Sequence, residues 1–350
     1  MPRARIHRIA TSAPDDTSGL RALIDNGDLD PSKLVAILGK TEGNGCVNDF
    51  TRAFAVSALK QVLGSAADGV SMVMSGETEG GLAPHIVTFE ALDDDDGRCP
   101  AMAIGSKISR DLAPHEIGTF AQIECVADTV SATINSAGIN ALSDVHFVQI
   151  KCPLLTAERV ASSQTAVATT DTLKSMGLSR GASALGIALA LDEIDLATAK
   201  SATIGADPEI WSARASTSAG IELMGHEVVV LGMSDRWSGP LRIDHAVMRD
   251  AIDTASVAIA LTRLGIGAET QLRAVFAKAE ASADGKIRGQ RHTMLDDSDI
   301  ASTRHARAFV GGALAGLTGG CDIYVSGGAE HQGPDGGGPV ALIAELALGS

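Results

Sequence analysis

Short runs of apolar residues alternate along the chain with longer segments whose apolar residues recur at helical spacing. The run LVAILGK at 34–40 is typical of a buried strand, and the segment 115–138 is typical of an amphipathic helix that ends at Gly138. This alternation predicts a protein of the α/β class. Strands are expected at 3–10, 34–40, 71–76, 85–92, 101–110, 146–151, 228–234, 241–248, 274–281, 322–328 and 340–348. Helices are expected at 20–27, 115–138 and 249–265, and around Arg52, Arg180 and Arg307.

One short unit of this pattern occurs three times. It consists of a β-rich run that ends in Lys, a helix of small residues that carries an Arg, and a second β-rich run that ends in Ser. The copies contain Lys40, Arg52 and Ser75, then Lys151, Arg180 and Ser234, then Lys278, Arg307 and Ser326. Their order is constant while their connections vary in length, which is typical of divergent repeats with loop insertions. We therefore divide the chain into unit A (1–103), unit B (104–248) and unit C (249–350).

The ordered repeat favours a single site to which each unit contributes a Lys, an Arg and a Ser. For any one of these residues, a plainer interpretation is a solvated side chain at the end of a strand, since loop residues are usually exposed. That interpretation does not explain why the same three residue types recur in the same order. The repeat therefore predicts one shared site.

Longer motifs in the same order carry a resemblance that covers essentially the whole chain. GKTEGNGCVNDFTR, MSGETEG, HFVQIKCPLLT, SRGASALGIALA, VFAKAEAS, RHTML and VSGGAEHQGP resemble the cyanuric acid hydrolase and barbiturase family of cyclic amide hydrolases, with the fuller similarity to cyanuric acid hydrolases. The resemblance implies three similar α/β repeat domains with pseudo-threefold symmetry around one central active site, and a homotetramer. At one position the chain departs from the implied motif Ser-Gly-Gly-Thr-Glu-Gly, because Glu77 replaces the second Gly.

The chemistry of a cyclic amide hydrolase fits these residue types. Hydrolysis needs a nucleophile, a base that activates it, and donors for the developing oxyanion. A Ser–Lys pair supplies the first two if the Lys is neutral, which burial or a cationic neighbour such as Arg favours. Three such sets could hold the three amide units of cyanuric acid, whose ring would open to carboxybiuret and then lose CO₂ to give biuret. The residues expected to bind the substrate are Lys40, Arg52, Ser75, Gly76, Arg180, Lys278, Arg307, Ser326 and Gly327.

The neighbours of the three lysines single out one of them as the base. Lys40 and Lys278 are each followed two residues later by a glutamate, Glu42 and Glu280. On an extended strand such a carboxylate shares the face of the lysine and holds it protonated. Lys151 has a proline at that position, so we predict that Lys151 is the catalytic base.

The nucleophile is predicted in the same way. Ser75 and Ser326 precede glycines whose backbone N–H groups can approach a carbonyl, whereas Ser234 precedes Asp235. We therefore assign Ser234 as the nucleophile of Lys151, and the resemblance points to the same dyad. The alternative is that divergence marks the second copy as degenerate and inactive.

The segment AEHQGPDGGGP at 329–339 is a Gly/Pro-rich turn that can direct several backbone carbonyls at one point. Taken alone, it is typical of a flexible loop. The resemblance implies a structural cation here, and oxygen ligands suit Mg²⁺ or Ca²⁺. No cofactor is expected for catalysis. The implied ligands are Glu280, Ala329, Gln332, Gly333, Pro334 and Gly337.

Composition excludes several other classes of function. The 350 residues are 45% hydrophobic and 20% charged, as in a folded globular protein. A net charge of −15 argues against a nucleic-acid partner, which requires a basic face. Five scattered cysteines indicate neither a disulfide framework nor a zinc site. We see no signal peptide and no run of the roughly 18 apolar residues that a membrane span needs, so we expect a cytoplasmic protein without a membrane partner.

Two other functions stay open. A barbiturase would bind barbituric acid, in which a CH₂ group replaces one NH and leaves one set of polar groups unpaired, at a cost of about 1–3 kcal/mol. A non-catalytic binder of small molecules would keep its lysines protonated. An assay of ring opening separates the binder from the two enzymes.

Overall fold

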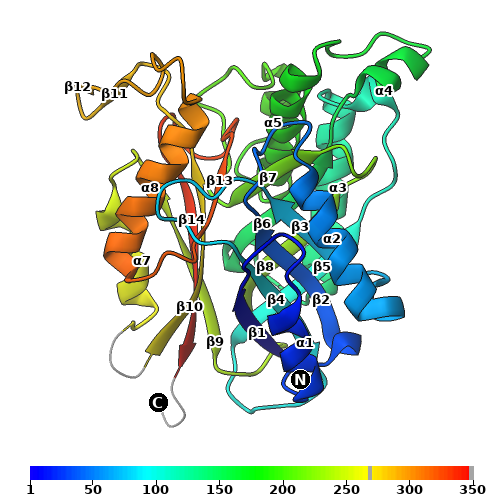
Figure 1. The fold of residues 1–350 in the computed structure, drawn as a ribbon, viewed down its shortest axis with the longest axis vertical. Coiled ribbons are helices and arrows are strands. Elements are labelled where there is room, and N and C mark those ends of the chain that lie inside the picture. The colour runs from blue at the N-terminus through cyan, green and yellow to red at the C-terminus, as the bar shows by residue number, and fades with distance from the viewer. Residues whose placement is uncertain (267–269, 347–350) are drawn as a thin grey trace.

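The computed structural model describes residues 1–266 and 270–346. Within these ranges the strands form three four-stranded sheets and one two-stranded hairpin. Figure 1 shows how these elements are arranged. Positions 347 and 348 of the last expected strand lie outside the described residues. The expected α/β class is confirmed.

Each sheet is formed by a separate stretch of the chain. The first contains β1 (Arg3–Ala10), β2 (Leu34–Lys40), β3 (Ser71–Ser75) and β4 (His85–Leu92). The second contains β5 (Ala101–Ile108), β6 (Val145–Pro153), β7 (Ala215–Gly220) and β8 (Glu227–Ser234). The third contains β9 (Leu241–Met248), β10 (Thr270–Ala279), β13 (Tyr324–Gly327) and β14 (Gly338–Leu346). The hairpin of β11 (Lys286–Ile287) and β12 (Gln290–Arg291) is separate from them.

The three sheets have the same topology. Their strand orders are β1-β4-β2-β3, β5-β8-β6-β7 and β9-β14-β10-β13. In each sheet the last two strands are parallel and the other neighbours are antiparallel. Each also has a register shift near the start of its second strand in sequence, at Leu34/Ala36, Val145/Phe147 and Leu272/Ala274. The sheets are therefore structural repeats as well as sequence repeats.

Helices connect the strands on the outer side of each sheet. The first sheet has α1 (Ser18–Asp25) and α2 (Phe50–Leu63), and the third has α7 (Thr254–Arg263) and α8 (Ser302–Thr318). The second has α3 (Phe120–Ser136), α4 (Ala157–Ser162), α5 (Thr172–Ala190) and α6 (Leu196–Ser201). In Figure 1, α7 and α8 lie beside the yellow-to-red third sheet, away from the other two sheets. Because α2, α5 and α8 each cross over between the two parallel strands of a sheet, each begins on the side of the carboxyl ends of those strands.

The inner faces of the sheets share one hydrophobic core. Phe276 of β10 lies 6.2 Å from Phe89 of β4 and 5.1 Å from Phe147 of β6, measured between ring centroids. Tyr324 of β13 is 5.6 Å from Phe276. Residues from all three sheets thus pack into the same cluster. The three sheets are held together by this core as one molecule.

Local sequence explains most of the helix ends. Asp49 caps α2 by accepting a hydrogen bond from the Thr51 backbone N–H, as its position predicts. Gly138 follows α3 with a φ of 69°, which glycine adopts without strain. The expected helix over 115–138 starts later, at Phe120, because Pro114 opens a separate 3₁₀ turn.

The structure corrects the expected limits of the three units. The sheets divide the chain between Leu92 and Ala101 and between Ser234 and Leu241. The expected division at 103/104 therefore runs through β5, and the division at 248/249 separates β9 from the sheet to which it belongs. The cause is that a strand joins the sheet of its pairing partner, which local sequence does not reveal.

Three strands were not predicted, namely β7 and the two short strands of the hairpin, β11 and β12. The six residues of β7, ASTSAG, are small or polar and show no apolar alternation, yet all six are buried.

The five cysteines are free. Among the described residues, no helix is long and apolar enough to cross a membrane.

Candidate active site

Three Lys–Ser pairs lie at the carboxyl ends of the parallel strands. Lys40 of β2 is in register with Ser75 of β3, and Lys278 of β10 is in register with Ser326 of β13. The second sheet has the same arrangement, and the residue opposite Lys151 of β6 is Ser218 of β7. All six side chains are buried, although lysine is normally exposed. The expected set of three lysines and three serines exists with Ser218 as its third serine.

The structure contradicts the predicted pairing of Lys151 with Ser234. Because β8 runs antiparallel to β6, Glu227 lies opposite Lys151 and Ser234 lies at the other end of the strand, opposite Ala101. Seven residues of extended chain separate Glu227 from Ser234, roughly 23 Å at 3.3 Å per residue. The Ser234 hydroxyl donates to the Gly138 carbonyl at 2.6 Å and accepts from a backbone N–H. Ser234 is a structural residue.

A signal in the sequence could have identified Ser218. Each serine of the set is followed four residues later by a glutamate, in Ser75-Gly-Glu-Thr-Glu79, Ser218-Ala-Gly-Ile-Glu222 and Ser326-Gly-Gly-Ala-Glu330. Ser234 lacks this pattern, because Ser238 stands four residues after it. Ser218 was not predicted, because β7 contains few of the β-branched and aromatic residues that are typical of strands.

Two of the Lys–Ser pairs share two contacts, and Lys278 Nζ also donates to the Thr217 carbonyl at 3.1 Å. Lys40 Nζ lies 3.1 Å from Ser75 Oγ and donates to the Gly76 carbonyl at 2.7 Å. Lys278 Nζ lies 3.1 Å from Ser326 Oγ and donates to the Gly327 carbonyl at 2.9 Å. Burial lowers the pKa of Lys40 to about 7, helped by the charge of Arg307. Burial likewise lowers the pKa of Lys278 to about 7, helped by Arg180.

The third pair is different. Lys151 Nζ donates to the Met74 carbonyl at 2.9 Å and lies 2.9 Å from Glu222 Oε1. Burial lowers the pKa of Lys151, and the charge of Glu222 opposes that shift. The prediction that Lys151 lacks an acidic neighbour was therefore wrong, because Glu222 is distant in sequence. Within the described part of the chain the Ser218 hydroxyl has no lysine donor, and it lies 3.4 Å from Ser326 Oγ.

The three expected arginines join neighbouring sheets around these pairs. Arg180 of α5 makes a bidentate ion pair with Glu330 after β13, at 2.7 and 2.9 Å. Arg307 of α8 makes the equivalent pair with Glu79 after β3, at 2.9 and 3.0 Å. Such planar two-point contacts fix the position of a guanidinium group.

Arg52 of α2 makes the third contact between neighbouring sheets, and this contact is weaker than the two ion pairs. Its Nη1 donates to the Ala219 carbonyl near the end of β7 at 3.3 Å, and its Nη2 donates to the Cys46 carbonyl at 2.9 Å. Its Nε is buried and has no hydrogen-bond partner among residues 1–266 and 270–346. A buried donor without a partner is expensive unless a ligand or water satisfies it.

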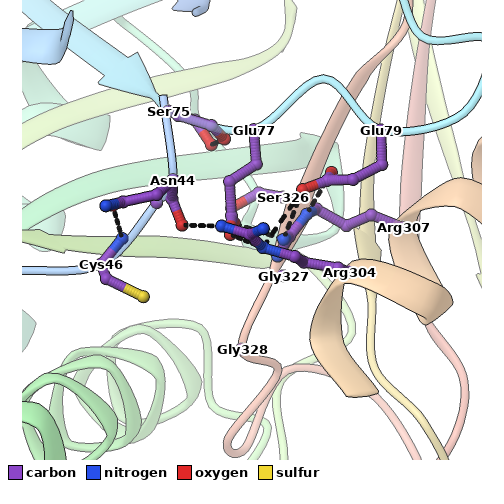
Figure 2. A network of polar contacts seen from close by, with 12 residues as sticks. Asn44, Cys46, Ser75, Glu77, Glu79, Arg304, Arg307, Ser326, Gly327 and Gly328 are labelled. Carbon is purple, nitrogen blue, oxygen red and sulfur yellow. Dashed lines mark hydrogen bonds and ion pairs between the residues drawn. The ribbon is translucent and has the colours of Figure 1, made fainter. Parts of the chain in front are cut away.

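A cavity of about 790 Å³ opens beside Arg180 and Arg307, whereas Arg52 and the three Lys–Ser pairs are not among its lining residues. Arg180, Arg307, Gly327, Gly328 and Glu330 are among its lining residues. Figure 2 shows the loop after Ser75 facing Ser326 and Gly327, with Arg307 between them. A flat polar ligand in this cavity would meet guanidinium groups and the backbone next to the serines.

The expected cation ligands are only partly brought together. Glu280, Ala329, Gly333 and Pro334 line a second cavity of about 360 Å³, whereas Gln332 and Gly337 are not among its lining residues. Gln332 instead joins two loops, since its Nε2 donates to the Gly328 carbonyl and its Oε1 accepts from the Thr217 N–H. Burial raises the pKa of Glu280, and so does the nearby charge of Glu330. Because Arg180 already holds both oxygens of Glu330, Glu280 is the carboxylate among the expected ligands that could bind a hard cation.

A second cluster could also be considered for a metal. His146, Asp244 and His245 lie together, with 2.9 Å between the two Nδ1 atoms. Both oxygens of Asp244 already accept from Arg263, at 2.6 and 3.0 Å. This cluster is therefore explained by an ion pair and a His–His hydrogen bond.

Comparisons with known proteins cover the whole chain. A family described as "Amidohydrolase ring-opening protein" matches residues 5–345. A cyanuric acid amidohydrolase of Azorhizobium caulinodans is 58% identical over 100% of both chains, and one of Rhizobium johnstonii is 55% identical over 98% of both. The solved cyanuric acid hydrolase from A. caulinodans covers 99% of this chain and 100% of its own, with a TM-score of 0.93. Another solved cyanuric acid hydrolase, described as an innovation by structural concatenation, is 47% identical with a TM-score of 0.94 and the same coverage.

Proposed function

Because the chain belongs to the family of ring-opening amidohydrolases and is a cyclic amide hydrolase, we propose that its substrate is cyanuric acid. The observation that carries this proposal is the convergence of three in-register Lys–Ser pairs with three arginines. Each set can bind one carbonyl of a flat ring that has three equivalent amide units. The geometry is compatible with pseudo-threefold symmetry around one site, supported by the identical order of the three sheets.

The proposed catalytic dyad is Ser218 with Lys151. Lys40 and Lys278 each lie within hydrogen-bond distance of their serine and donate to the carbonyl of the residue after it, so the similarity of the two pairs favours a common role in binding. The second set is different, and its serine lacks a lysine donor among the described residues. Arg180 forms an ion pair with Glu330. If Arg52 formed the equivalent ion pair with Glu222, Lys151 would lose its contact with Glu222 and could hydrogen-bond to Ser218.

The proposed reaction proceeds through an acyl-enzyme. Lys151 Nζ accepts the Ser218 proton while Oγ attacks a ring carbonyl, and the oxyanion is stabilised by donors next to the serines. The ring C–N bond then breaks, and the lysine returns its proton to the departing nitrogen. Water, deprotonated by the same lysine, hydrolyses the Ser218 ester to release carboxybiuret, which loses CO₂ to give biuret. No external oxidant or cofactor takes part in these steps.

Ser75 with Lys40 is the competing dyad. It is favoured by the distance of 3.1 Å between its two atoms and by a lysine pKa of about 7. Trapping with an acylating inhibitor, followed by peptide mapping, decides between the two. An adduct on Ser218 supports the proposal, and an adduct on Ser75 overturns it.

The substrate is tested by comparing turnover of cyanuric and barbituric acids by the purified protein. We expect hydrolysis of cyanuric acid, with barbituric acid a poor substrate or an inhibitor, since one set of polar groups would lose its partner. Faster turnover of barbituric acid would identify a barbiturase. Binding of either ring without turnover would identify a binding protein.

We also propose a structural Mg²⁺ or Ca²⁺ held by Glu280 and the carbonyls of Ala329, Gly333 and Pro334. The cation would tie the loop after β13 to the end of β10 and hold Glu330 against Arg180. Glu280→Gln is expected to lower both the bound-metal content and the melting temperature. Unchanged values for both would refute the site. Gln332 and Gly337 as ligands, and the homotetramer, stay predictions from the resemblance.

A further inference from the structure

Glu77 stands where the other two serine loops have glycine, Gly220 and Gly328. It adopts a left-handed backbone with a φ of 78°, close to the 69° of Gly328. This conformation is unfavourable for any residue that carries a Cβ. Strain of this kind persists where the surrounding structure holds it, and it often marks a functional contact.

The Glu77 side chain is buried among charged groups beside the active-site cavity. Its Oε2 forms an ion pair with Arg307 Nη2, and its Oε1 lies 3.4 Å from Arg304 Nε. Its carboxyl carbon lies so close to Gly45 that a Cβ there would come within 2.1 Å. Figure 2 shows Glu77 directed from the loop after Ser75 towards both arginines.

The carboxylate changes the charge that one arginine offers to a ligand. Arg307 is already paired with Glu79, so Glu77 is its second carboxylate. The equivalent Arg180 pairs with Glu330 and lies on bare backbone at Gly328, where a Cβ would come within 2.5 Å of the guanidinium carbon. Burial raises the pKa of Glu77 and the charge of Arg307 opposes that shift, while pairing with two guanidinium groups favours the ionised form.

The position and the charge of Glu77 bear on which rings can bind in the cavity. It lines the same cavity as Arg180 and Arg307, so a ring that enters the cavity meets its carboxylate. Barbituric acid readily loses a proton from the CH₂ between two carbonyls and is an anion at neutral pH, whereas cyanuric acid is a weaker acid that is only partly ionised there. A fixed negative charge repels an anion and leaves a neutral ring unaffected.

We propose that Glu77 is a specificity-determining residue that selects against anionic rings. This inference rests on the proposed function, because it assumes that a cyclic amide binds in this cavity. The carboxylate lowers the positive potential at Arg307, so discrimination arises from repulsion of the competitor in addition to contacts with the substrate. The strained backbone is what places the charge at this point.

The test compares two matched rings by calorimetry at pH 7. Barbituric acid is anionic there, whereas 5,5-dimethylbarbituric acid has lost the acidic CH₂ protons and is largely neutral. Glu77→Gln is expected to tighten the Kd of barbituric acid about tenfold, equivalent to about 1.4 kcal/mol, and that of the dimethyl compound less than about twofold. Glu77→Gly, which also relieves the backbone, is expected to shift selectivity in the same direction.

Two further variants separate an electrostatic role from a structural one. Arg304→Gln removes a positive charge that offsets Glu77. It is expected to weaken the binding of barbituric acid several-fold, which is opposite to the effect expected of Glu77→Gln. Glu124→Gln, at an exposed position of α3, removes the same charge outside the cavity and should leave both Kd values unchanged.

An equal change for both rings in Glu77→Gln, or weaker binding of barbituric acid, overturns the role of Glu77. Failure to hydrolyse cyanuric acid would overturn the proposed reaction. The comparison of Kd values would still test the role of Glu77, because calorimetry measures binding without turnover. Absence of binding of either ring by every variant would overturn both.

Discussion

At the scale of single residues, the site depends on charged groups in an apolar setting. Lys40, Lys151 and Lys278 are each 1% exposed, and burial lowers the pKa of all three. A lysine that loses its proton near neutral pH can accept one from a serine, which an exposed lysine cannot do efficiently. Their environment, more than their identity, makes these lysines suitable for amide hydrolysis.

Ser218→Ala is expected to lower kcat by at least about a thousandfold, because it removes the proposed nucleophile. Ser75→Ala should cost roughly 10²-fold, as the loss of a donor to a carbonyl does. Ser234→Ala is the matched control and should stay within about twofold of wild type. Steady-state assays on cyanuric acid measure all three, and appreciable activity in Ser218→Ala would contradict the assignment.

The pKa of Lys278 predicts how stability depends on pH. Above about pH 7 the folded protein has released this proton, while the unfolded chain keeps it up to the ordinary value of 10.5. The unfolded state then binds more protons, so the free energy of unfolding rises with pH by up to about 1.4 kcal/mol per unit between these values. The cost of the buried charge is fully present below pH 7.

Lys278→Met should remove this contribution. Urea unfolding at pH 7, 8 and 9 is expected to show a smaller slope for the variant than for wild type. Lys60→Met, at an exposed position of α2, is the control and should keep the wild-type slope. Identical slopes for all three proteins would show that Lys278 keeps its proton over this range.

At the scale of elements, the three helices α2, α5 and α8 connect each sheet to the loop of another. Arg180 on α5 holds the loop after β13, and Arg307 on α8 holds the loop after β3. Arg52 on α2 reaches the end of β7 through the Ala219 backbone carbonyl. A substitution in one repeat should therefore affect binding groups in the next.

Glu330→Gln tests this connection. It should cost about 1–3 kcal/mol in stability, because Arg180 would lose its charged partner in a partly buried place, and it should raise KM because the guanidinium group is no longer fixed. The exposed ion pair of Arg291 and Asp296 provides the control. Asp296→Asn is expected to cost less than about 1 kcal/mol and to leave KM unchanged. Equal effects of the two variants would show that the cross-sheet pair has no special role.

At the scale of the whole molecule, one core joins three sheets of the same topology. Phe276 contacts aromatic rings from both other sheets, so it lies where all three meet. The convergence of the three serine-bearing edges at one site depends on this packing. We expect the molecule to unfold in one step, because no sheet keeps a complete core when the others separate.

Phe276→Ala should therefore destabilise the entire protein by about 3–5 kcal/mol. The single unfolding transition that we expect by circular dichroism should move to a lower temperature without splitting. Phe309→Ala on α8, where the side chain is largely exposed, should cost much less. A separate transition for the third sheet in Phe276→Ala would show that the repeats are independent domains.

The sequence by itself determined the α/β class, most of the strands, the lysines and the arginines of the site. Hydrophobic periodicity and helix caps act between residues close in the chain, so they can be read locally. The repeat of Lys and Arg could be found for the same reason, since each lies in a strongly apolar strand or helix. The resemblance carried by the longer motifs indicated the family before any coordinates.

Only the tertiary structure decided which serine meets Lys151 and which acidic residue lies beside it. The strand β7 has small residues because it is enclosed by its neighbours, so its sequence lacks the apolar alternation that marks a strand. Its parallel register with β6 places Ser218 opposite Lys151, and the loop that follows places Glu222 on the same lysine. Strand pairing joins residues that are distant in the chain, and for that reason neither contact could be read from the order of the residues alone.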